Sequence, residues 1–173
     1  MINDGYWRYE LFIRRHIIRF WSLINRLCYS KRNEHRVSKE ILFTAVIVRK
    51  IIEDDKEIRA VSRKNKWEEP PLETMKYRIP VWQLPYIGEA DPIGYNFVAS
   101  DYDYESAKNV QYDLSIMCNK IIHSNIWSIV YDGRKRMDSI AFSSDKEKAK
   151  ESYVIELKDW LNMLQFVSNN AAV

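Results

Sequence analysis

Residues 118–142 read CNKIIHSNIWSIVYDGRKRMDSIAF, and the spacing of their apolar residues changes partway along. Before His123 the apolar positions recur every three or four residues, as they do on an amphipathic helix. After it the period becomes two, which predicts a β-hairpin with its turn at Asp132-Gly133. The alternating apolar residues are Trp127, Ile129, Tyr131, Ile140 and Phe142. A chain that passes from helix to antiparallel strands in this way is typical of the α+β class.

Helical spacing dominates the chain before this stretch. Residues 6–27 predict a long amphipathic helix with two apolar stripes, which contacts neighbours on two sides. A second helix is expected from about residue 38, where Ser38 is a suitable N-cap, to the early sixties, packed antiparallel to the first. A third helix is expected over residues 106–124. Its buried stripe consists of Val110, Leu114, Met117 and Ile121.

The remaining segments complete a single domain. Residues 67–105 combine prolines with large aromatic side chains, which predicts an ordered connector, with residues 77–84 as a short edge strand or an extended segment. After the hairpin, the alternation of Tyr153, Ile155 and Leu157 predicts a third antiparallel strand, and residues 159–168 predict a last helix. We therefore expect an α+β, mainly α fold over residues 1–173. Its parts are a basic helical pair (1–66), the connector (67–105), the third helix (106–125), and a small antiparallel β-meander with a C-terminal helix (126–173).

The composition of the 173 residues excludes several classes of protein. With 46% hydrophobic and 29% charged residues, and only four Gly and five Pro, the chain is neither disordered nor collagen-like. Cys28 and Cys118 lack a metal-ligand spacing, the three histidines have no acidic or thiol partner at such a spacing, and no glycine-rich phosphate loop occurs. We therefore expect no cofactor and no metal. The longest nearly apolar run, residues 41–48, is too short to span a bilayer, so a cytoplasmic protein without a membrane partner is expected.

Positive charge is concentrated in the first part of the chain. Residues 1–66 hold 16 Lys and Arg against 8 Asp and Glu, whereas residues 67–173 hold 11 against 16. Arg8, Arg15, Arg19 and Arg26 share one side of the first predicted helix, and residues 134–136 place three cations at the tip of the hairpin. Such a surface is suited to RNA, to an acidic protein partner, or to the acidic half of a second copy in a homo-oligomer. A solvated helix surface is the alternative.

The helix before the hairpin ends in a short motif. Asn119 and His123 are four residues apart, so they share one helix face. A long helical pair followed by a helix that ends in Asn-x-x-x-His resembles the HEPN superfamily, helical-bundle proteins of which many are metal-independent ribonucleases of toxin and antiviral systems. The motif of that family is an arginine, then four to six residues, then a histidine, commonly with asparagine directly after the arginine. In this chain Cys118 stands at the position of the arginine.

The resemblance implies a role for each matching residue. His123 would act as a general base or acid on a ribose 2′-hydroxyl, and Asn119 would take the place of the asparagine. In the family the arginine would hold the phosphate, which a thiol cannot do, unless Lys120, Arg134 or Arg136 replaces it. The alternative for His123 is a residue at a helix C-terminus that interacts favourably with the helix dipole.

These observations lead to one leading hypothesis and two alternatives. The leading hypothesis is a HEPN-like protein, non-catalytic or weakly catalytic, that binds RNA or a protein partner in a toxin–antitoxin or phage-defence setting. The alternatives are a protein-interaction subunit with no nucleic-acid role and an active metal-independent endoribonuclease. The candidate catalytic residues are His123 and Asn119. The candidate RNA- or partner-binding residues are Arg8, Arg15, Arg19, Arg26, Arg134 and Arg136.

Overall fold

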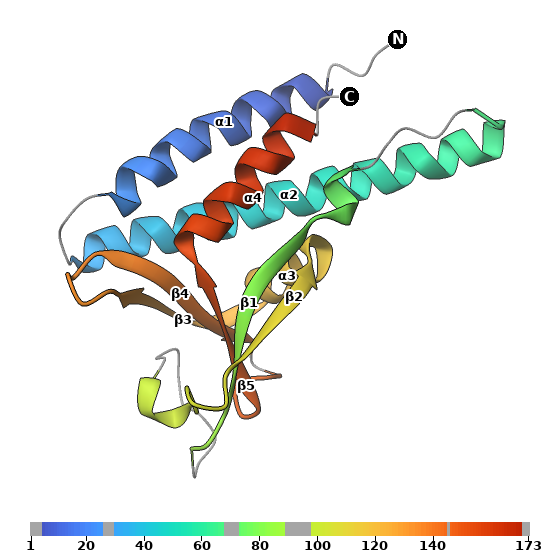
Figure 1. Ribbon diagram of the computed structural model, residues 1–173. Helices are drawn as coiled ribbons and strands as arrows, with labels where there is room; N and C mark the ends of the chain where they lie inside the picture. Colours follow the sequence, from blue (N-terminus) through green and yellow to red (C-terminus); the bar gives the residue numbers. More distant parts are fainter. Residues whose placement is uncertain (1–4, 26–29, 68–72, 89–97, 145, 171–173) are drawn as a thin grey trace.

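Figure 1 shows the computed structural model, which describes residues 5–25, 30–67, 73–88, 98–144 and 146–170. The described residues form four α-helices and five β-strands. The helices are α1 (Gly5–Ile24), α2 (Lys31–Asn65), α3 (Leu114–Ile122) and α4 (Leu157–Asn170). The strands are β1 (Arg78–Pro85), β2 (Lys108–Asp113), β3 (Ser124–Tyr131), β4 (Met137–Ser144) and β5 (Glu151–Glu156). Two short 3-10 helices are also present, Glu73–Lys76 and Ala99–Asp101. The predicted α+β, mainly α fold class is confirmed.

The strands form one antiparallel sheet in the order β2-β1-β5-β4-β3. The predicted hairpin is present as β3 and β4, with Ile129 opposite Ile140 and Trp127 opposite Phe142. Residues 78–85 form β1, which pairs with β2 on one side and β5 on the other and is therefore not an edge strand. Pro80 is tolerated in β1 because it lies outside the part of the strand that pairs with β5. The edge strands are β2 and β3.

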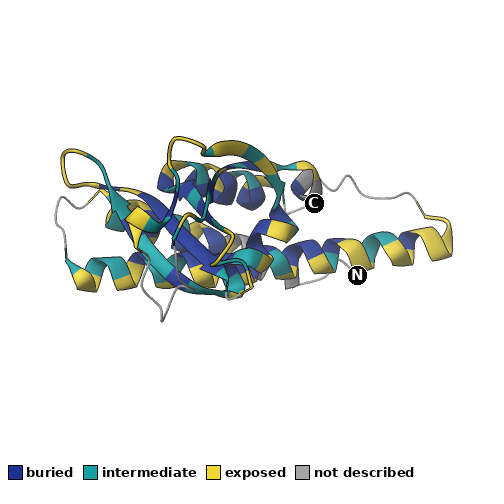
Figure 2. Ribbon diagram, turned by 90° about the horizontal axis from the view of Figure 1, so that it is seen from below, coloured by how far each residue is buried: buried dark blue, intermediate teal, exposed yellow. Residues whose placement is uncertain are grey.

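The helices cover one face of this sheet (Figure 1). Phe142 and Tyr153 point from β4 and β5 into a core that they share with Trp160 of α4, and all three are almost completely buried. The indole Nε1–H of Trp160 donates to the hydroxyl of Thr44 on α2 at 3.0 Å, so that α4 is bonded to α2 inside the core. The helical pair α1 and α2 forms the outer layer, and Figure 2 shows the last turns of α2 extending beyond the rest of the molecule.

The expected third helix is partly wrong. Residues 108–113 form strand β2, and only Leu114–Ile122 is helical. The reason is tertiary: Val110 pairs with Val81 and Tyr112 with Ile79 of β1, and this pairing replaces the helical hydrogen bonds. Leu114, Met117 and Ile121 are buried in the helix as expected. The sheet therefore has five strands rather than the three of the expected meander.

The boundaries of the other elements differ less. The second helix begins at Lys31, seven residues before the expected start, because Ser30 rather than Ser38 is its N-cap and accepts from the backbone N–H of Asn33 at 3.1 Å. The third strand of the predicted meander ends at Glu156, and Leu157 starts α4. In the connector, Tyr77 packs on Phe166 of α4, whereas Trp67 is 64% exposed rather than buried.

In the part of the chain that the structure describes, no helix combines the length and the apolar character needed to cross a membrane.

Candidate nucleic-acid interface

The two candidate catalytic residues lie together at the end of α3, on the surface. His123 is the C-cap of the helix, and its backbone N–H donates to the Asn119 carbonyl at 3.0 Å. Both side chains are exposed to solvent. Within the described part of the chain, no side chain hydrogen-bonds to the His123 imidazole, so nothing fixes its tautomer or its orientation. A general base is normally oriented by a second group, and the described residues supply none here.

The residue at the position of the family's arginine points the other way. Cys118 is fully buried, in the core between α3 and α2. Burial raises the pKa of its thiol to about 12, against a smaller opposing effect of Arg49. Cys118 is therefore a neutral core residue and does not share the surface on which Asn119 and His123 lie.

The cations named as replacements for the arginine are also engaged or distant. Arg134 and Arg136 lie beyond the far end of β3 from His123, and an eight-residue strand is about 26 Å long. Lys120 lies one turn before His123, but its ammonium donates to the hydroxyl of Tyr153 at 2.7 Å and to the carboxylate of Glu147. The described geometry thus brings His123 and Asn119 together, with Lys120 engaged elsewhere and Arg134 and Arg136 at the far end of β3.

Lys120 belongs to a partly buried polar cluster that sequence reasoning missed. The cluster joins α3 to β5 and to the turn before it. The Tyr153 hydroxyl accepts from Lys120 and donates to Glu151, which also accepts from Gln83 of β1. Burial and the hydrogen bond to Glu151 raise the pKa of Tyr153 far above its ordinary value. Although burial alone would raise the pKa of Glu147, hydrogen bonds from Lys120 and Ser144 lower it. Because these groups satisfy one another, the cluster connects elements of the fold.

The candidate binding arginines come from two of three elements that meet at one end of the molecule. The C-terminal half of α1 lies beside the N-terminal half of α2, and the tip between β3 and β4 reaches the same end (Figure 1). The Tyr131 hydroxyl of β3 donates to Glu34 of α2 at 3.0 Å, which joins the hairpin to the helix. We call this region the basic end. Its exposed cations are Arg15, Arg19, Lys31, Arg32, Arg36, Lys39, Arg134, Lys135 and Arg136.

Of the six arginines predicted as a binding set, four can be placed. Arg15 and Arg19 are exposed on α1, and Arg134 and Arg136 are exposed at the hairpin tip. The side chains of Arg8 and Arg26 lie outside the described residues. Sequence reasoning missed the contribution of α2, whose first turns carry four exposed cations between residues 31 and 39. The apolar pattern is interrupted there, which concealed the helix.

The acidic side chains of the basic end already have partners inside the protein. Glu34 accepts from Tyr131, and Glu40 bonds to the buried imidazole of His16 and lies 4.0 Å from the Arg19 guanidinium. Asp132 accepts from the backbone N–H groups of Arg134 and Arg136 and from the Arg136 guanidinium, and these hydrogen bonds lower its pKa. Among the described residues, these carboxylates form ion pairs with only two of the exposed cations, Arg19 and Arg136.

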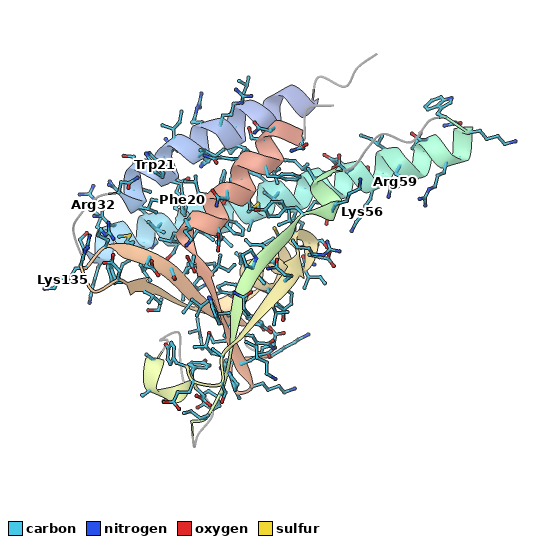
Figure 3. The ribbon with its side chains drawn as sticks, in the orientation of Figure 1. Phe20, Trp21, Arg32, Lys56, Arg59 and Lys135 are labelled. Atoms are coloured by element: carbon cyan, nitrogen blue, oxygen red, sulfur yellow. The ribbon has the colours of Figure 1, made fainter. Side chains whose placement is uncertain are left out.

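Most of the cations, in contrast, are unpaired. Among the described residues, Lys31, Arg32, Arg36, Lys39, Arg134 and Lys135 make no ion pair. Figure 3 shows Arg32, Lys135 and Trp21 of α1 toward the same end of the molecule. The indole of Trp21 is 57% exposed. An exposed aromatic ring among unpaired cations is the combination that nucleic-acid surfaces use, cations for phosphates and a ring for bases.

The basic end also contains a groove between α2 and the edge strand β3. Its volume is about 520 Å³. Its apolar surface is formed by Leu42, Trp127 and Ile129, and its polar rim by Lys31, Glu34, His35, Ser38, Lys39 and Ser128. A second depression of about 620 Å³ lies between α1 and α2, where Arg19 faces Arg36 and Lys39. Lys39 borders both depressions, so the positive surface is continuous across α2.

A second group of cations lies at the far end of α2 and differs from the first. It includes Lys56, Arg63, Lys64 and Lys66. These residues come from one element, on the helical turns that Figure 2 shows extending away from the body. Arg63 has interactions of its own, and Lys56 lines a small depression of about 160 Å³ together with residues of β2 and α3.

No group of three or more His, Cys, Asp or Glu side chains that could hold a metal ion occurs among the described residues. Comparisons of the chain with protein-family models, with curated proteins and with solved structures find no match.

Proposed function

We propose that this chain binds single-stranded RNA through the basic end and does not cleave it. One observation carries the proposal: unpaired cations from α2 and the β3–β4 tip lie at the end of the molecule that also carries the exposed indole of Trp21, and among the described residues only Arg19 and Arg136 of this end pair with a carboxylate. Phosphate contacts supply most of the affinity of a non-specific RNA-binding surface. Binding without cleavage fits the surface position of His123 and the engagement of Lys120. The HEPN resemblance and a toxin–antitoxin or defence setting remain predictions from the sequence.

Charge reversal tests the proposal. The variant Arg32→Glu/Lys135→Glu changes two exposed cations of the basic end, and the control Lys64→Glu/Lys150→Glu changes two exposed cations elsewhere by the same total charge. Because only the first pair faces the bound strand, we expect it to weaken binding to a labelled ten-residue U10 RNA by about tenfold or more at 100 mM salt. The control should change the affinity by less than about threefold. Equal losses in the two variants would contradict a localised site.

A protein partner is the second candidate function, and one feature of β3 favours it. This strand is an edge of the sheet, spans eight residues and contains no charged residue. Edges of this kind accept an added strand from another chain unless they are protected. A complex formed by strand addition depends on backbone hydrogen bonds and apolar contacts, so its affinity should vary little with salt, unlike that of RNA.

A further inference from the structure

We infer that the groove between α2 and β3 is a nucleobase pocket in which Trp127 stacks on one base of a bound RNA strand. The inference rests on the RNA binding proposed above and specifies where the base lies. One side of the Trp127 indole packs against Phe142 on the neighbouring strand β4, with ring centroids 5.8 Å apart and planes tilted by 31°. Because β3 is an edge strand of the sheet, no strand formed by the described residues covers the side away from Phe142.

The orientation of the indole is fixed in advance. Its Nε1–H donates to the Ser124 carbonyl at 2.9 Å, and its packing on Phe142 restrains the ring plane. A base that stacks on a ring held in this way does not have to order it first, which lowers the entropic cost of binding. Leu42 forms the apolar wall across the groove from α2, and it is 40% exposed.

The rim has the chemistry that a nucleotide requires. Lys31 and Lys39 border the groove and make no ion pair with any residue that the structure describes, so they are placed for the phosphates on either side of a stacked base. Ser38, His35 and Ser128 provide hydrogen-bonding groups at the base edge. The rim carries one carboxylate, Glu34, and it is bonded to Tyr131. An apolar ligand would leave the polar and charged groups of the rim unpaired, and an acidic peptide would not stack on the indole of Trp127. A nucleotide can stack on the indole and also pair with the cations of the rim.

The test compares two probes and one substitution. The probes are labelled U10 RNA and a ten-residue strand with the same sugar-phosphate backbone but no bases. Trp127→Leu keeps an apolar side chain and removes the aromatic face. We expect the wild-type protein to bind U10 about tenfold or more tightly than the abasic strand, and the variant to lose that difference while its affinity for the abasic strand stays within twofold. The matched control is Trp82→Leu, at a tryptophan that is 40% exposed on β1 and should not affect either probe.

A second pair of variants covers the case in which Trp127→Leu does not fold. Leu42 and Val46 are both exposed on α2, 40% and 49% respectively, but only Leu42 lines the groove. Leu42→Asp should lower the affinity for U10 at least fivefold relative to Val46→Asp. Val46→Asp is the matched control because it introduces the same charge on the same helix outside the groove.

The outcomes separate this inference from the proposed function. Equal binding of U10 and the abasic strand by the wild-type protein, with strong salt dependence, would leave RNA binding in place and overturn the base pocket. Failure of the wild-type protein to bind either strand would overturn both. Stronger competition by polyglutamate than by U10 would indicate an acidic protein partner and also overturn the pocket. Equal losses for both probes in Trp127→Leu would show that the tryptophan has a structural role only.

Discussion

Cys118 occupies the position of the motif's arginine in the sequence, but its side chain does not lie beside those of Asn119 and His123 in space. Cys118, Asn119 and His123 lie within one short helix, yet Cys118 points into the core while the other two point into solvent. On a helix, neighbouring residues are about 100° apart, so an arginine directly before the asparagine need not share its environment. In this fold the arginine position of the HEPN pattern is a core position.

Replacing Cys118 with arginine should therefore unfold the protein rather than restore a site. Cys118→Arg would bury a guanidinium in the core, where Arg49 already exerts a positive potential, and we expect it to lower the free energy of unfolding by about 3 kcal/mol or more. Asn119→Arg, at the adjacent exposed position, should change it by less than about 0.5 kcal/mol. Urea titrations monitored by circular dichroism measure both. Equal stability of the two variants would place Cys118 outside the core.

Residue-level reasoning from sequence identified some parts of the basic end and missed others. Arg134 and Arg136 were predictable because the turn at Asp132-Gly133 has a strong local signature. Trp127 was predictable as a strand residue but not as the wall of a groove, because the opposite wall comes from residues 31–42 of α2. Which cations are free was not predictable either. The partners of the acidic side chains decide this, and those partners can be distant in the sequence: Glu34 accepts from Tyr131, which is 97 positions away.

At the scale of elements, the sequence pattern predicted those helices and strands whose conformation is determined by neighbouring residues. Helices α1 and α4 and the β3–β4 hairpin follow from apolar periodicity and a turn signal. The division of residues 106–124 into β2 and α3 does not, because Val110, Leu114, Met117 and Ile121 have helical spacing throughout. Only the partner strand β1, far away in sequence, selects the extended conformation for the first part.

The polar cluster around Lys120 connects several of these elements and makes stability depend on pH. The pKa of Glu147 is lower in the folded protein than its ordinary value of 4.5, so its contribution is present above that pH and is lost as the pH falls through the folded pKa. Glu147→Gln should therefore destabilise the protein by about 1 kcal/mol at pH 7 and show a smaller loss than the wild type between pH 5 and about pH 3.

Urea midpoints at a series of pH values measure this effect. Glu57→Gln is the matched control, because Glu57 is exposed on α2 and makes no interaction among the described residues. The control should follow the acid dependence of the wild type. If Glu147→Gln follows it too, the ion pair of Glu147 with Lys120 contributes nothing to the connection between α3 and the turn before β5.

At the scale of the whole molecule, the sequence predicted a basic half but not a basic end. Part of the excess charge of residues 1–66 lies along the 35-residue helix α2, with one group of cations near Lys31 and another near Lys64. Among the described residues, only the first group lies beside other basic elements, because the C-terminal half of α1 and the β3–β4 tip are at the same end of α2 (Figure 1). The way in which the helices pack on the sheet therefore determines which cations lie together on one surface.

The salt dependence of RNA binding tests the central claim most directly. If about four phosphates contact the basic end, the logarithm of the association constant should fall with the logarithm of salt concentration with a slope of about −2.8, or about fifty-fold between 50 and 200 mM. Fluorescence anisotropy with U10 RNA and the wild-type protein measures this slope, and Arg32→Glu/Lys135→Glu should reduce it by about half. An affinity that changes less than about twofold over the same range, or no binding at 50 mM, would contradict the account.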